Sequence, residues 1–274
     1  MRSIKKIMTN ELVTISPDHS VRKAIEMMEN YKIGCLPVLE NSQLVGLITS
    51  RDVRSNHPNR IVADAMSKKI ITISPNCSLW EAEKLLNQYC IEHLIIVSDN
   101  SPVGIITKAQ LYMELGKCID PLTGLNTADF IRYKAFELLQ QGNEISIIFC
   151  DVDNFGAINK AHGHIIGDKI LCEVAQILIG LIDANTDYLC RYAGDEFSIV
   201  TTRHLDTVMD LTTRISDVFT KRNWPSDVKV TLSSGIARGQ RDTCNGTDLM
   251  KTVNNVINQA SLASTKAKRE KVIS

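Results

Sequence analysis

The first 115 residues contain one sequence pattern twice, and this internal repeat constrains the fold more than any other feature of the chain. The segment Val13-Thr-Ile-Ser-Pro17 recurs as Ile71-Thr-Ile-Ser-Pro75, which is an offset of 58 residues (75 minus 17). The same offset places Gly46-Leu-Ile-Thr49 on Gly104-Ile-Ile-Thr107. Because the offset is constant across the unit, we interpret the two copies as duplicates of one supersecondary module.

Each copy predicts the same order of elements. After a proline turn, apolar residues at helical spacing predict an amphipathic helix. In the first copy these apolar residues are Val21, Ala24, Ile25 and Met28. Two strands are expected over residues 35–39 and 44–48, because the residues between them favour a reversal of the chain. A second helix is expected to begin near Thr49 in one copy and near Thr107 in the other.

Over residues 5–115 the repeat resembles a pair of CBS domains, named after cystathionine β-synthase. The family pattern G-h-h-T-x-x-D, with h apolar, is matched fully by Gly46-Leu-Ile-Thr-Ser-Arg-Asp52. The second copy reads Gly104-Ile-Ile-Thr-Lys-Ala-Gln110, so an amide replaces its carboxylate. The resemblance implies that an adenine nucleotide (AMP, ADP or ATP) binds this unit as a regulator. The residues implied to contact it are Thr49, Arg51, Asp52 and Thr107.

The chemistry of the pattern fits this role, and it also fits a purely structural one. A hydroxyl at a helix start and a carboxylate one turn later can both hydrogen-bond a ribose diol, while helix amides face phosphate. Alternatively, Thr49 is a helix N-cap and Asp52 complements the helix dipole. The repeat pair would then serve as a dimerisation scaffold.

The rest of the chain is long enough for another domain, because 274 residues exceed what one hydrophobic core usually organises. The turn residues Asp120-Pro-Leu-Thr-Gly124 interrupt the helical pattern that leaves the second repeat. We therefore expect repeat one over residues 1–57, repeat two over 58–115 and a further domain over 116–274.

Two strand ends in the further domain carry carboxylates. The apolar run 145–150 predicts a buried strand that ends in Asp151-Val-Asp153. Strands over 188–192 and 197–202 are joined by Ala193-Gly-Asp-Glu196. Oxygen ligands of this kind, completed by phosphate oxygens, are what a Mg²⁺ site for a nucleotide requires. Taken separately, either group is also typical of a solvated turn.

A series of motifs makes this domain resemble the GGDEF-type diguanylate cyclases over residues 118–268. They are Asp120-Pro-Leu-Thr-Gly-Leu125, Asp151-Val-Asp-Asn-Phe155 with Asn159, Gly163-His-Ile-Ile-Gly-Asp168, Arg191-Tyr-Ala-Gly-Asp-Glu-Phe197, Val230-Thr-Leu-Ser-Ser-Gly-Ile236 and Ala267-Lys268. The resemblance implies an α/β (α+β) fold of the nucleotidyl cyclase and polymerase palm type, with a mainly antiparallel sheet flanked by helices. It also implies that two GTP molecules are condensed into cyclic di-GMP by a twofold homodimer with half a site on each subunit.

The resemblance also assigns roles to individual residues. Asp151, the Val152 carbonyl and Asp195 are the implied ligands of Mg²⁺ or Mn²⁺. The implied catalytic carboxylates are Asp151, Asp195 and Glu196. The implied nucleotide-binding residues are Leu122, Phe155, Gly156, Asn159, Lys160, Asp168 and Lys268.

Guanine recognition is implied for Asn159 and Asp168, because a carboxylate accepts hydrogen bonds from the N1 and N2 hydrogens of guanine and an amide can face the remaining polar edge. An alternative role for Asp168 is the N-cap of an apolar helix expected over residues 170–182. We interpret His162 and His164 as loop structure and not as metal ligands.

Several positions lack the side chain that the family pattern carries. Gly156 stands where a lysine follows D-x-D-x-F, and Val272 stands where an arginine follows A-K-x-x-G. Thr127 and Ala128 replace an asparagine and an arginine. The affinity for GTP is therefore expected to suffer, although Lys160, on the same helix face as Gly156, can take the place of the missing lysine. A non-catalytic GTP-binding domain that signals through protein contacts remains an alternative, and a structural scaffold is a third.

Relatives with an R-x-x-D site ahead of the signature are inhibited by their product. The corresponding stretch here is Ala184-Asn-Thr-Asp187, without an arginine. A bidentate clamp cannot form from alanine, so we expect little inhibition by cyclic di-GMP at this position.

Charge and composition exclude other classes of function. Lys plus Arg and Asp plus Glu number 31 each, so the chain has no excess of positive charge that would favour binding to nucleic acid or an anionic membrane. No apolar run is long enough to span a bilayer, and the N-terminus lacks a secretory apolar core. The eight cysteines form no C-x-x-C pair and are expected to be reduced. We therefore expect a soluble cytoplasmic protein.

Overall fold

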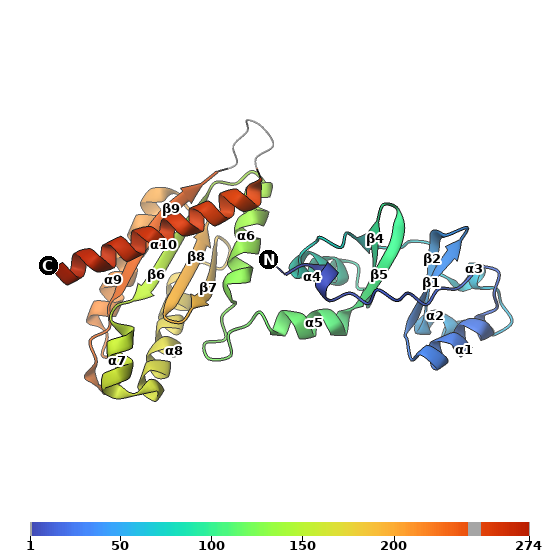
Figure 1. The fold of residues 1–274 in the computed structure, drawn as a ribbon, viewed down its shortest axis with the longest axis horizontal. Helices are drawn as coiled ribbons and strands as arrows, with labels where there is room; N and C mark the ends of the chain where they lie inside the picture. Colours follow the sequence, from blue (N-terminus) through green and yellow to red (C-terminus); the bar gives the residue numbers. More distant parts are fainter. Residues whose placement is uncertain (1, 241–247, 274) are drawn as a thin grey trace. The chain divides into compact units, whose positions relative to one another are not determined.

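The computed structural model describes residues 2–240 and 248–273, so Cys244 lies outside the described residues. The internal contacts divide the chain into two compact units, Arg2–Gly116 and Lys117–Ser274. Figure 1 labels the helices and strands of both units.

The N-terminal unit consists of two copies of a helix, a hairpin and a second helix (Figure 1). The first copy contains α1 (Val21–Tyr31), β1 (Cys35–Glu40), β2 (Gln43–Thr49) and α2 (Ser50–Ser55), preceded by the short helix η1 (Ile4–Lys6) and followed by α3 (Val62–Ala65). The second copy contains β3 (Thr72–Ile73), α4 (Leu79–Gln88), β4 (His93–Ser98), β5 (Ser101–Thr107) and α5 (Lys108–Gly116).

The repeat predicted from the sequence is confirmed in detail. The bounds of β1 and β2, shifted by 58 residues, coincide with those of β4 and β5. Both hairpins carry an irregularity at the equivalent point, between Val38 and Leu39 in one and between Ile96 and Val97 in the other. Equivalent sequences have therefore produced equivalent strand register.

The N-terminal segment ties the two repeats together. Ile15 pairs with Val38 of the first repeat, whereas Thr9 pairs with Ile105 of the second. The amide of Thr9 donates to the Ile105 carbonyl at 2.9 Å, and the Ile105 amide donates back at 3.0 Å. One segment thus contributes to both repeats, which makes the unit a single folded body.

The second unit contains one sheet, with strand order β7-β8-β6-β9 and every neighbouring pair antiparallel. Its elements are α6 (Ala128–Gln140), β6 (Ile145–Val152), α7 (Phe155–His162), α8 (His164–Leu181), β7 (Asp187–Ala193), β8 (Glu196–Thr201), α9 (Leu205–Lys221), η2 (Pro225–Asp227), β9 (Leu232–Gly239) and α10 (Leu249–Ile273). The predicted antiparallel sheet flanked by helices is confirmed.

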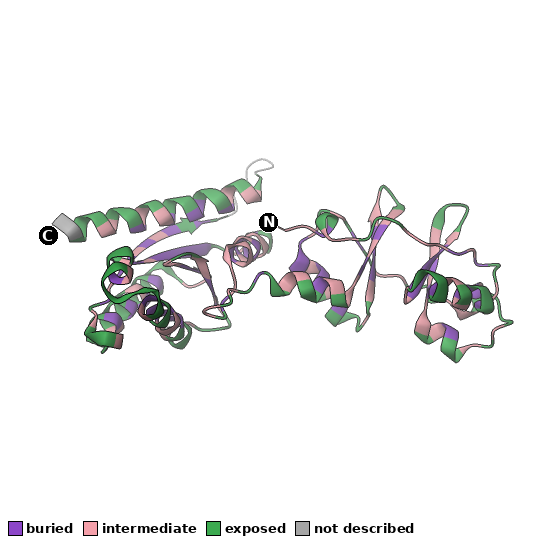
Figure 2. Ribbon diagram, turned by 60° about the horizontal axis from the view of Figure 1, so that its bottom comes forward, coloured by how far each residue is buried: buried purple, intermediate pink, exposed green. Residues whose placement is uncertain are grey.

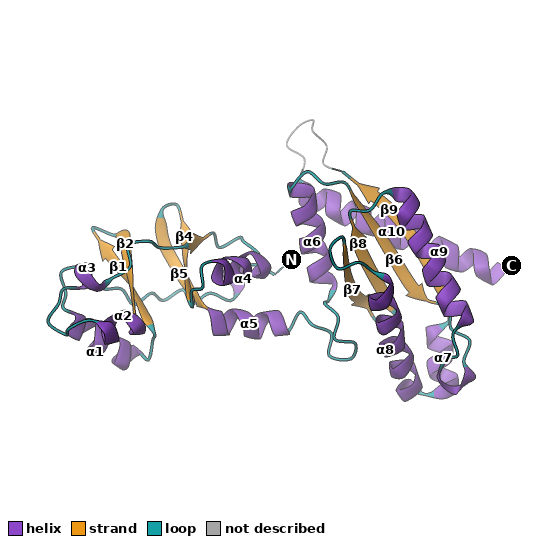
Figure 3. Ribbon diagram, turned by 180° about the vertical axis from the view of Figure 1, so that it is seen from behind, coloured by secondary structure: helices purple, strands orange, loops and turns teal. Residues whose placement is uncertain are grey.

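Helices cover both faces of this sheet. In Figure 3, α8 and α9 lie on the near face, and α6 and α10 lie behind it. Each face has its own apolar core, one formed with α8 and α9 and the other with α6 and α10. Figure 2 shows that α10 turns a buried stripe toward the sheet and leaves its opposite side exposed. The result is a three-layer unit in which the central strands are buried on both sides.

Helix α10 lies directly on β9 because β9 carries a glycine at the contact. A Cβ atom at Gly235 would come within 2.2 Å of the Ala260 carbonyl oxygen and of the Ser264 amide nitrogen. The Ser264 hydroxyl, which is buried, donates to the Ser233 carbonyl at 2.9 Å. The approach of two backbones therefore depends on the absence of a side chain at position 235.

The start of α8 differs from the sequence prediction. The helix begins at His164, with Gly163 at φ 80° before it, and not near residue 170. Asp168 consequently lies inside the helix, and its predicted alternative role as an N-cap is wrong. The apolar pattern detected only the buried part of the helix, because the first turn is largely exposed.

At the edge of the sheet, Asp187 forms a buried polar cluster. Its carboxylate accepts hydrogen bonds from the Thr201 hydroxyl at 2.6 Å and from Arg203 Nε at 2.9 Å, and the Asp183 amide donates to it at 2.8 Å. Burial alone would raise the pKa of Asp187, but these contacts outweigh it and hold the pKa below its ordinary value. The charge of Asp187 therefore stabilises the folded state.

The described helices include no segment with the length and apolar character required to cross a membrane. The cysteines within the described residues are all free thiols.

We expect Gly235→Ala to destabilise the second unit by about 1–3 kcal/mol, because the new methyl group collides with the backbone of α10. Gly180→Ala is the matched control, because a Cβ there meets nothing within 4 Å and alanine favours a helix. Calorimetric melting of the full chain measures both. Equal melting of the two variants would contradict the packing argument.

We expect Asp187→Asn to destabilise the second unit by about 1.5–3 kcal/mol at neutral pH, because it leaves the half-buried Arg203 without its charge partner. Since the folded-state pKa is lowered, this stabilisation is present above the unfolded-state pKa of about 3.9 and is lost as the pH falls through the folded-state value. Calorimetry from pH 7 to pH 3 should show the difference from wild type shrinking. The exposed Asp210→Asn is the control, and a difference independent of pH would exclude this role.

Candidate active site and nucleotide pockets

Strand β6 is the central element of the candidate active site, because it lies between β8 and β9 and is buried along almost its whole length. Side chains of a strand alternate between the two faces of the sheet. Ile147 and Phe149 join the core beneath α6 and α10, whereas Ile148 and Cys150 join the core beneath α8 and α9. Asp151 continues the first series, so its carboxylate faces α10.

The β7–β8 turn brings two further carboxylates to the same place. Glu196 is the register partner of Asp151 across the β6–β8 pair. The amide of Val152 donates to the carbonyl of Asp195 at 3.2 Å. The predicted residues Asp151, Val152, Asp195 and Glu196 therefore converge, although they come from strands that are distant in the sequence.

A salt bridge that the sequence did not predict anchors this turn. Arg191 donates from Nη1 to both oxygens of Asp120 at 3.0 Å and from Nε to the Gly194 carbonyl at 2.8 Å. Asp120 also accepts from the Thr123 amide at 2.8 Å. Two of the sequence motifs, D-P-L-T-G-L and R-Y-A-G-D-E-F, are thus parts of one structural unit.

The electrostatics of the carboxylate group fit a hard divalent cation. Burial raises the pKa of Asp151 above its ordinary value, and Asp195 and Asp153 add to the effect while Lys268 opposes it. Burial, followed by the charges of Asp151 and Asp195, raises the pKa of Glu196. A cation bound to oxygen ligands would offset this repulsion.

The protein ligands alone would leave the coordination of such a cation incomplete. Among the described residues, no group of three or more His, Cys, Asp or Glu side chains is arranged to hold a metal ion. Asp151, the Val152 carbonyl and Asp195 would therefore need the phosphate oxygens of a nucleotide, which is the usual arrangement for Mg²⁺.

Helix α10 brings two lysines to the end of β6. Lys268 Nζ donates to the Asp151 carboxylate and, at 3.3 Å, to the Val152 carbonyl. Lys271 Nζ donates to Asp153 at 3.0 Å and to the Leu232 carbonyl at 2.6 Å. Lys268 was predicted from the sequence, and Lys271, which stands at the glycine position of A-K-x-x-G, was not.

Asp153 is a structural carboxylate next to the site, and the sequence did not reveal its role. It accepts from the hydroxyls of Thr231 and Ser233, each at 2.6 Å. These hydrogen bonds and Lys271 outweigh burial and hold the pKa of Asp153 below its ordinary value. The available signal was the V-T-L-S-S-G motif, whose hydroxyls are the partners of Asp153.

The remaining predicted residues lie on α7, on α8 and in the loop before α6. Phe155 and Leu122 are partly buried against the core beneath α8 and α9. Gly156 and Lys160 are exposed on α7, and Asp168 is exposed on α8. Because α7 includes both Gly156 and Lys160, these two residues lie one turn apart on the same face, as predicted.

Asn159 lies where α7 and α8 approach each other. A Cβ at Gly167 would come within 1.9 Å of Asn159 Oδ1, so the glycine makes room for the amide. Within the described residues, this buried Oδ1 has no hydrogen-bond partner. Asp168 follows Gly167 directly, so the two predicted guanine-reading residues belong to one helix junction.

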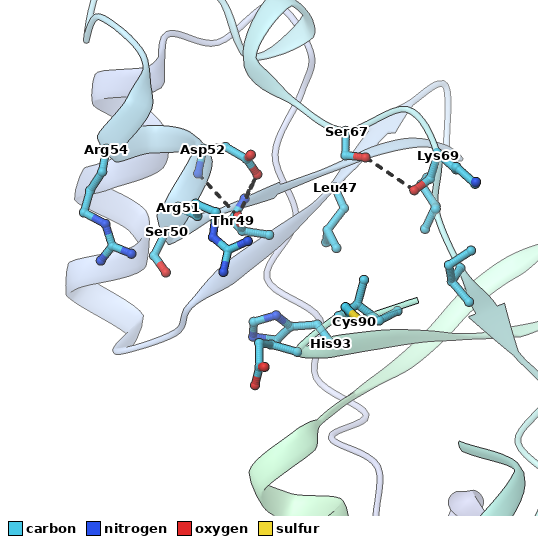
Figure 4. Close-up of a pocket in the computed structure, with 14 residues that line it drawn as sticks. Leu47, Thr49, Ser50, Arg51, Asp52, Arg54, Ser67, Lys69, Cys90 and His93 are labelled. Carbon is cyan, nitrogen blue, oxygen red and sulfur yellow. Dashed lines mark hydrogen bonds between the residues drawn. The ribbon is translucent and has the colours of Figure 1, made fainter. Parts of the chain in front are cut away.

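The N-terminal unit contains a cavity of about 380 Å³ between its repeats. Figure 4 shows Thr49, Asp52 and Arg51 in one group, Ser67 and Lys69 in a second, and His93 below the first group. The wall includes three cationic residues (Arg51, Arg54 and Lys69) and two anionic residues (Asp52 and Glu92). An anionic ligand therefore fits this cavity better than a cationic one.

The helix-capping role and a ligand-binding role of Asp52 are compatible. Thr49 caps α2, and Asp52 Oδ2 accepts from the Thr49 amide at 2.8 Å and from its hydroxyl at 2.7 Å. Within the described residues, Asp52 Oδ1 forms no hydrogen bond, so the cap does not use this oxygen.

The structure does not bring Thr107 to the other predicted nucleotide contacts. Thr107 lines a second cavity, of about 360 Å³, together with Gln110, Lys32 and His93. Gln110 Oε1 accepts from the Thr107 amide at 2.9 Å, and Gln110 Nε2 donates to the Thr9 hydroxyl at 3.3 Å. The amide therefore repeats the cap of the first copy but presents a donor where Asp52 presents an acceptor. His93 lines both cavities, and burial lowers its pKa.

Relatives of known sequence match this chain over part of its length. The CBS domain-containing protein YhcV of Bacillus subtilis is 34% identical over 117 residues, which are 40% of this chain and 84% of YhcV. Inosine-5'-monophosphate dehydrogenase of Korarchaeum cryptofilum is 32% identical over 114 residues, which are 41% of this chain and 24% of the dehydrogenase. The chain thus spans most of the first relative and about a quarter of the second.

A solved structure matches more of the chain. The coiled coil and GGDEF domain of DgcB from Caulobacter crescentus, solved in complex with c-di-GMP, covers 70% of this chain and 90% of that chain with a TM-score of 0.50 and 20% identity. At 20% identity, this match shows a similarity of fold only. The family model described as "Diguanylate cyclase, GGDEF domain" matches residues 117–267, and the CBS domain model matches residues 4–57 and 62–117. The chain belongs to the GGDEF diguanylate cyclase family and carries a CBS domain pair ahead of its GGDEF domain.

Proposed function

We propose that this chain is a diguanylate cyclase that condenses two GTP molecules into cyclic di-GMP in the presence of Mg²⁺ or Mn²⁺. The observation that carries the proposal is the convergence of Asp151, Asp195 and Glu196 at one strand end, with Lys268 reaching them from α10. DgcB, whose fold is similar, was solved in complex with c-di-GMP, which is the product of the proposed reaction.

Each residue has a chemical task in this proposal. Asp151, the Val152 carbonyl and Asp195 would hold the cation, and Glu196 would lie near the 3′-hydroxyl that attacks. When bound, Mg²⁺ neutralises charge on the triphosphate and orients it. Lys268 contacts the phosphates. Because each domain binds one GTP, a homodimer presents the α-phosphate of one nucleotide to the 3′-hydroxyl of the other. Each of the two attacks forms one phosphodiester bond, breaks the bond between the α- and β-phosphates and releases one pyrophosphate, while the hydroxyl loses its proton.

Guanine recognition is proposed for the junction of α7 and α8. Asn159 has a buried amide oxygen without a partner among the described residues. A buried acceptor without a hydrogen bond costs about 1–3 kcal/mol, and a hydrogen bond from an N–H of the base would remove this penalty. Asp168, exposed on α8, can accept from N1 and N2 of guanine.

The alternative is a domain that binds GTP without turning it over. The exposed Gly156 on α7 favours it, because the family carries a lysine there, and Val272 replaces a further cation. Lys160, one turn from Gly156, is proposed to supply part of the missing charge. Turnover with GTP separates the two functions.

The full chain incubated with GTP and Mg²⁺ should form cyclic di-GMP, which chromatography with mass detection measures. Asp151→Asn and Asp195→Asn should each lower turnover about 10²- to 10³-fold, the range typical of losing one preorganised electrostatic contact. ATP should give little product, because Asp168 accepts from hydrogens that adenine lacks.

Asp210→Asn on the exposed side of α9 is the matched control, and circular dichroism verifies that each variant is folded. Binding of GTP without product in wild type would support the non-catalytic alternative. Product formation that Asp151→Asn leaves unchanged would exclude the proposed metal site.

An adenine nucleotide is proposed as the regulator bound by the CBS pair. The cavity beside Thr49 is large enough for part of a nucleotide, carries more cationic than anionic residues and has Asp52 in its wall, whose carboxylate is proposed to accept from a ribose. For regulation, the nucleotide must bind the active and inactive arrangements with different affinity. The chain continues from α5, which ends at Gly116, directly into the GGDEF domain at Lys117, and this continuity offers a covalent route for the coupling.

Asp52→Asn should weaken nucleotide binding about 10- to 100-fold, because it removes a hydrogen bond to a charged group while an amide oxygen can still cap α2. Titration calorimetry with AMP, ADP and ATP measures the affinity, and initial cyclase rates at saturating ligand measure the coupling, typically about 1–3 kcal/mol.

Asp64→Asn, an exposed carboxylate of α3 outside the cavity wall, should bind as wild type does. If no adenine nucleotide binds, or one binds without a change in cyclase rate, the CBS pair is better regarded as a dimerisation scaffold.

A further inference from the structure

The end of α10 presents two ammonium groups to two carboxylates. Lys268 and Lys271 are three residues apart and therefore lie on the same face of the helix. Their partners, Asp151 and Asp153, are two residues apart and lie on the same side of the sheet. The lysines differ in what they hold, and this difference suggests different roles.

Lys268 contacts oxygens that a metal ion would also need. Its ammonium group donates to Asp151 and, at 3.3 Å, to the Val152 carbonyl. These are two of the three protein ligands in the proposed function. Mg²⁺ binds oxygen at about 2.0–2.1 Å and repels a neighbouring ammonium group, so both cations cannot hold these oxygens together.

Lys271 is suited to remain in place. It donates to Asp153 at 3.0 Å and to the Leu232 carbonyl at 2.6 Å. Asp153 is already held by the hydroxyls of Thr231 and Ser233 and is not a proposed metal ligand. The close packing at Gly235 also keeps α10 on β9. Lys268 can therefore change partners by a side-chain rotation, without movement of the helix.

We propose that Lys268 is an exchangeable internal cation of the site. It holds Asp151 and the Val152 carbonyl before substrate arrives, and it moves onto the triphosphate when the metal takes over these oxygens. The consequence is that metal alone binds weakly, whereas metal and GTP bind cooperatively. This inference rests on the proposed cyclase site and adds the order in which its cations act.

The test compares Mn²⁺ binding with nucleotide binding in the full chain. Lys268→Met should bind Mn²⁺ roughly tenfold more tightly than wild type in the absence of nucleotide, because the competing charge is gone. The same variant should bind 3′-deoxy-GTP, which cannot condense, roughly tenfold more weakly in the presence of Mn²⁺. The electron paramagnetic resonance signal of free Mn²⁺ and titration calorimetry measure the two affinities.

Lys266→Met is the matched control, because Lys266 lies on the same helix with a side chain that is 79% exposed. It should change neither affinity. Lys271→Met should lower the melting temperature without tightening Mn²⁺ binding. If Lys268→Met does not fold, Lys268→Gln removes the charge but keeps a polar end group, and it carries the same expectation.

The double variant Lys268→Met with Asp151→Asn distinguishes a failure of the cation exchange from a failure of the proposed metal site. The gain in Mn²⁺ affinity should disappear in the double variant. If Mn²⁺ binding is unaffected by Asp151→Asn, the proposed metal site is wrong. If Asp151→Asn abolishes binding but Lys268→Met leaves Mn²⁺ affinity unchanged or weaker, the metal site stands and the exchange is overturned.

Discussion

The burial of β6 on both faces is the constraint on which the GGDEF domain depends. A strand enclosed by helices on each side and by β8 and β9 at its edges has one permitted register, because a shift of one residue would turn every side chain to the other face. That register sets Glu196 opposite Asp151 and turns Asp151 toward α10. The grouping of these carboxylates is therefore a consequence of core packing. The apolar residues that precede Asp151 in β6 fix the position of its side chain.

The second requirement of the GGDEF domain is the close packing of α10 against β9. Gly235 lets the two backbones meet, and Ser264 and Lys271 add polar contacts to the strand. The helix thereby delivers Lys268 to the site. In this chain α7 lacks the lysine of the family pattern at Gly156, so α10 carries the cationic contacts formed with the carboxylates. In the proposed function, substrate affinity and helix packing would therefore both depend on α10.

In the CBS pair, one local structure caps a helix in each repeat and, in the proposed function, also takes part in nucleotide recognition. Thr49 with Asp52 and Thr107 with Gln110 form the same helix cap, so duplication preserved the fold of both copies. The polar atom that each side chain keeps outside the cap differs. Asp52 has a second carboxylate oxygen, which is an acceptor, whereas Gln110 has an amide nitrogen, which is a donor. The two cavities are therefore chemically distinct although their frameworks are alike, and His93, which lines both, is the residue through which they meet.

The sequence by itself determined the repeat, the element order and most residues of the candidate site, because periodicity and turn chemistry are local and the motifs retain their spacing. It misplaced the start of α8 and missed the contacts of Asp120 with Arg191 and of Asp153 with Lys271. These pairs join residues 71 and 118 positions apart, and no local pattern encodes such a contact. Only the tertiary structure decided which charges meet, because strand order and helix packing set those distances.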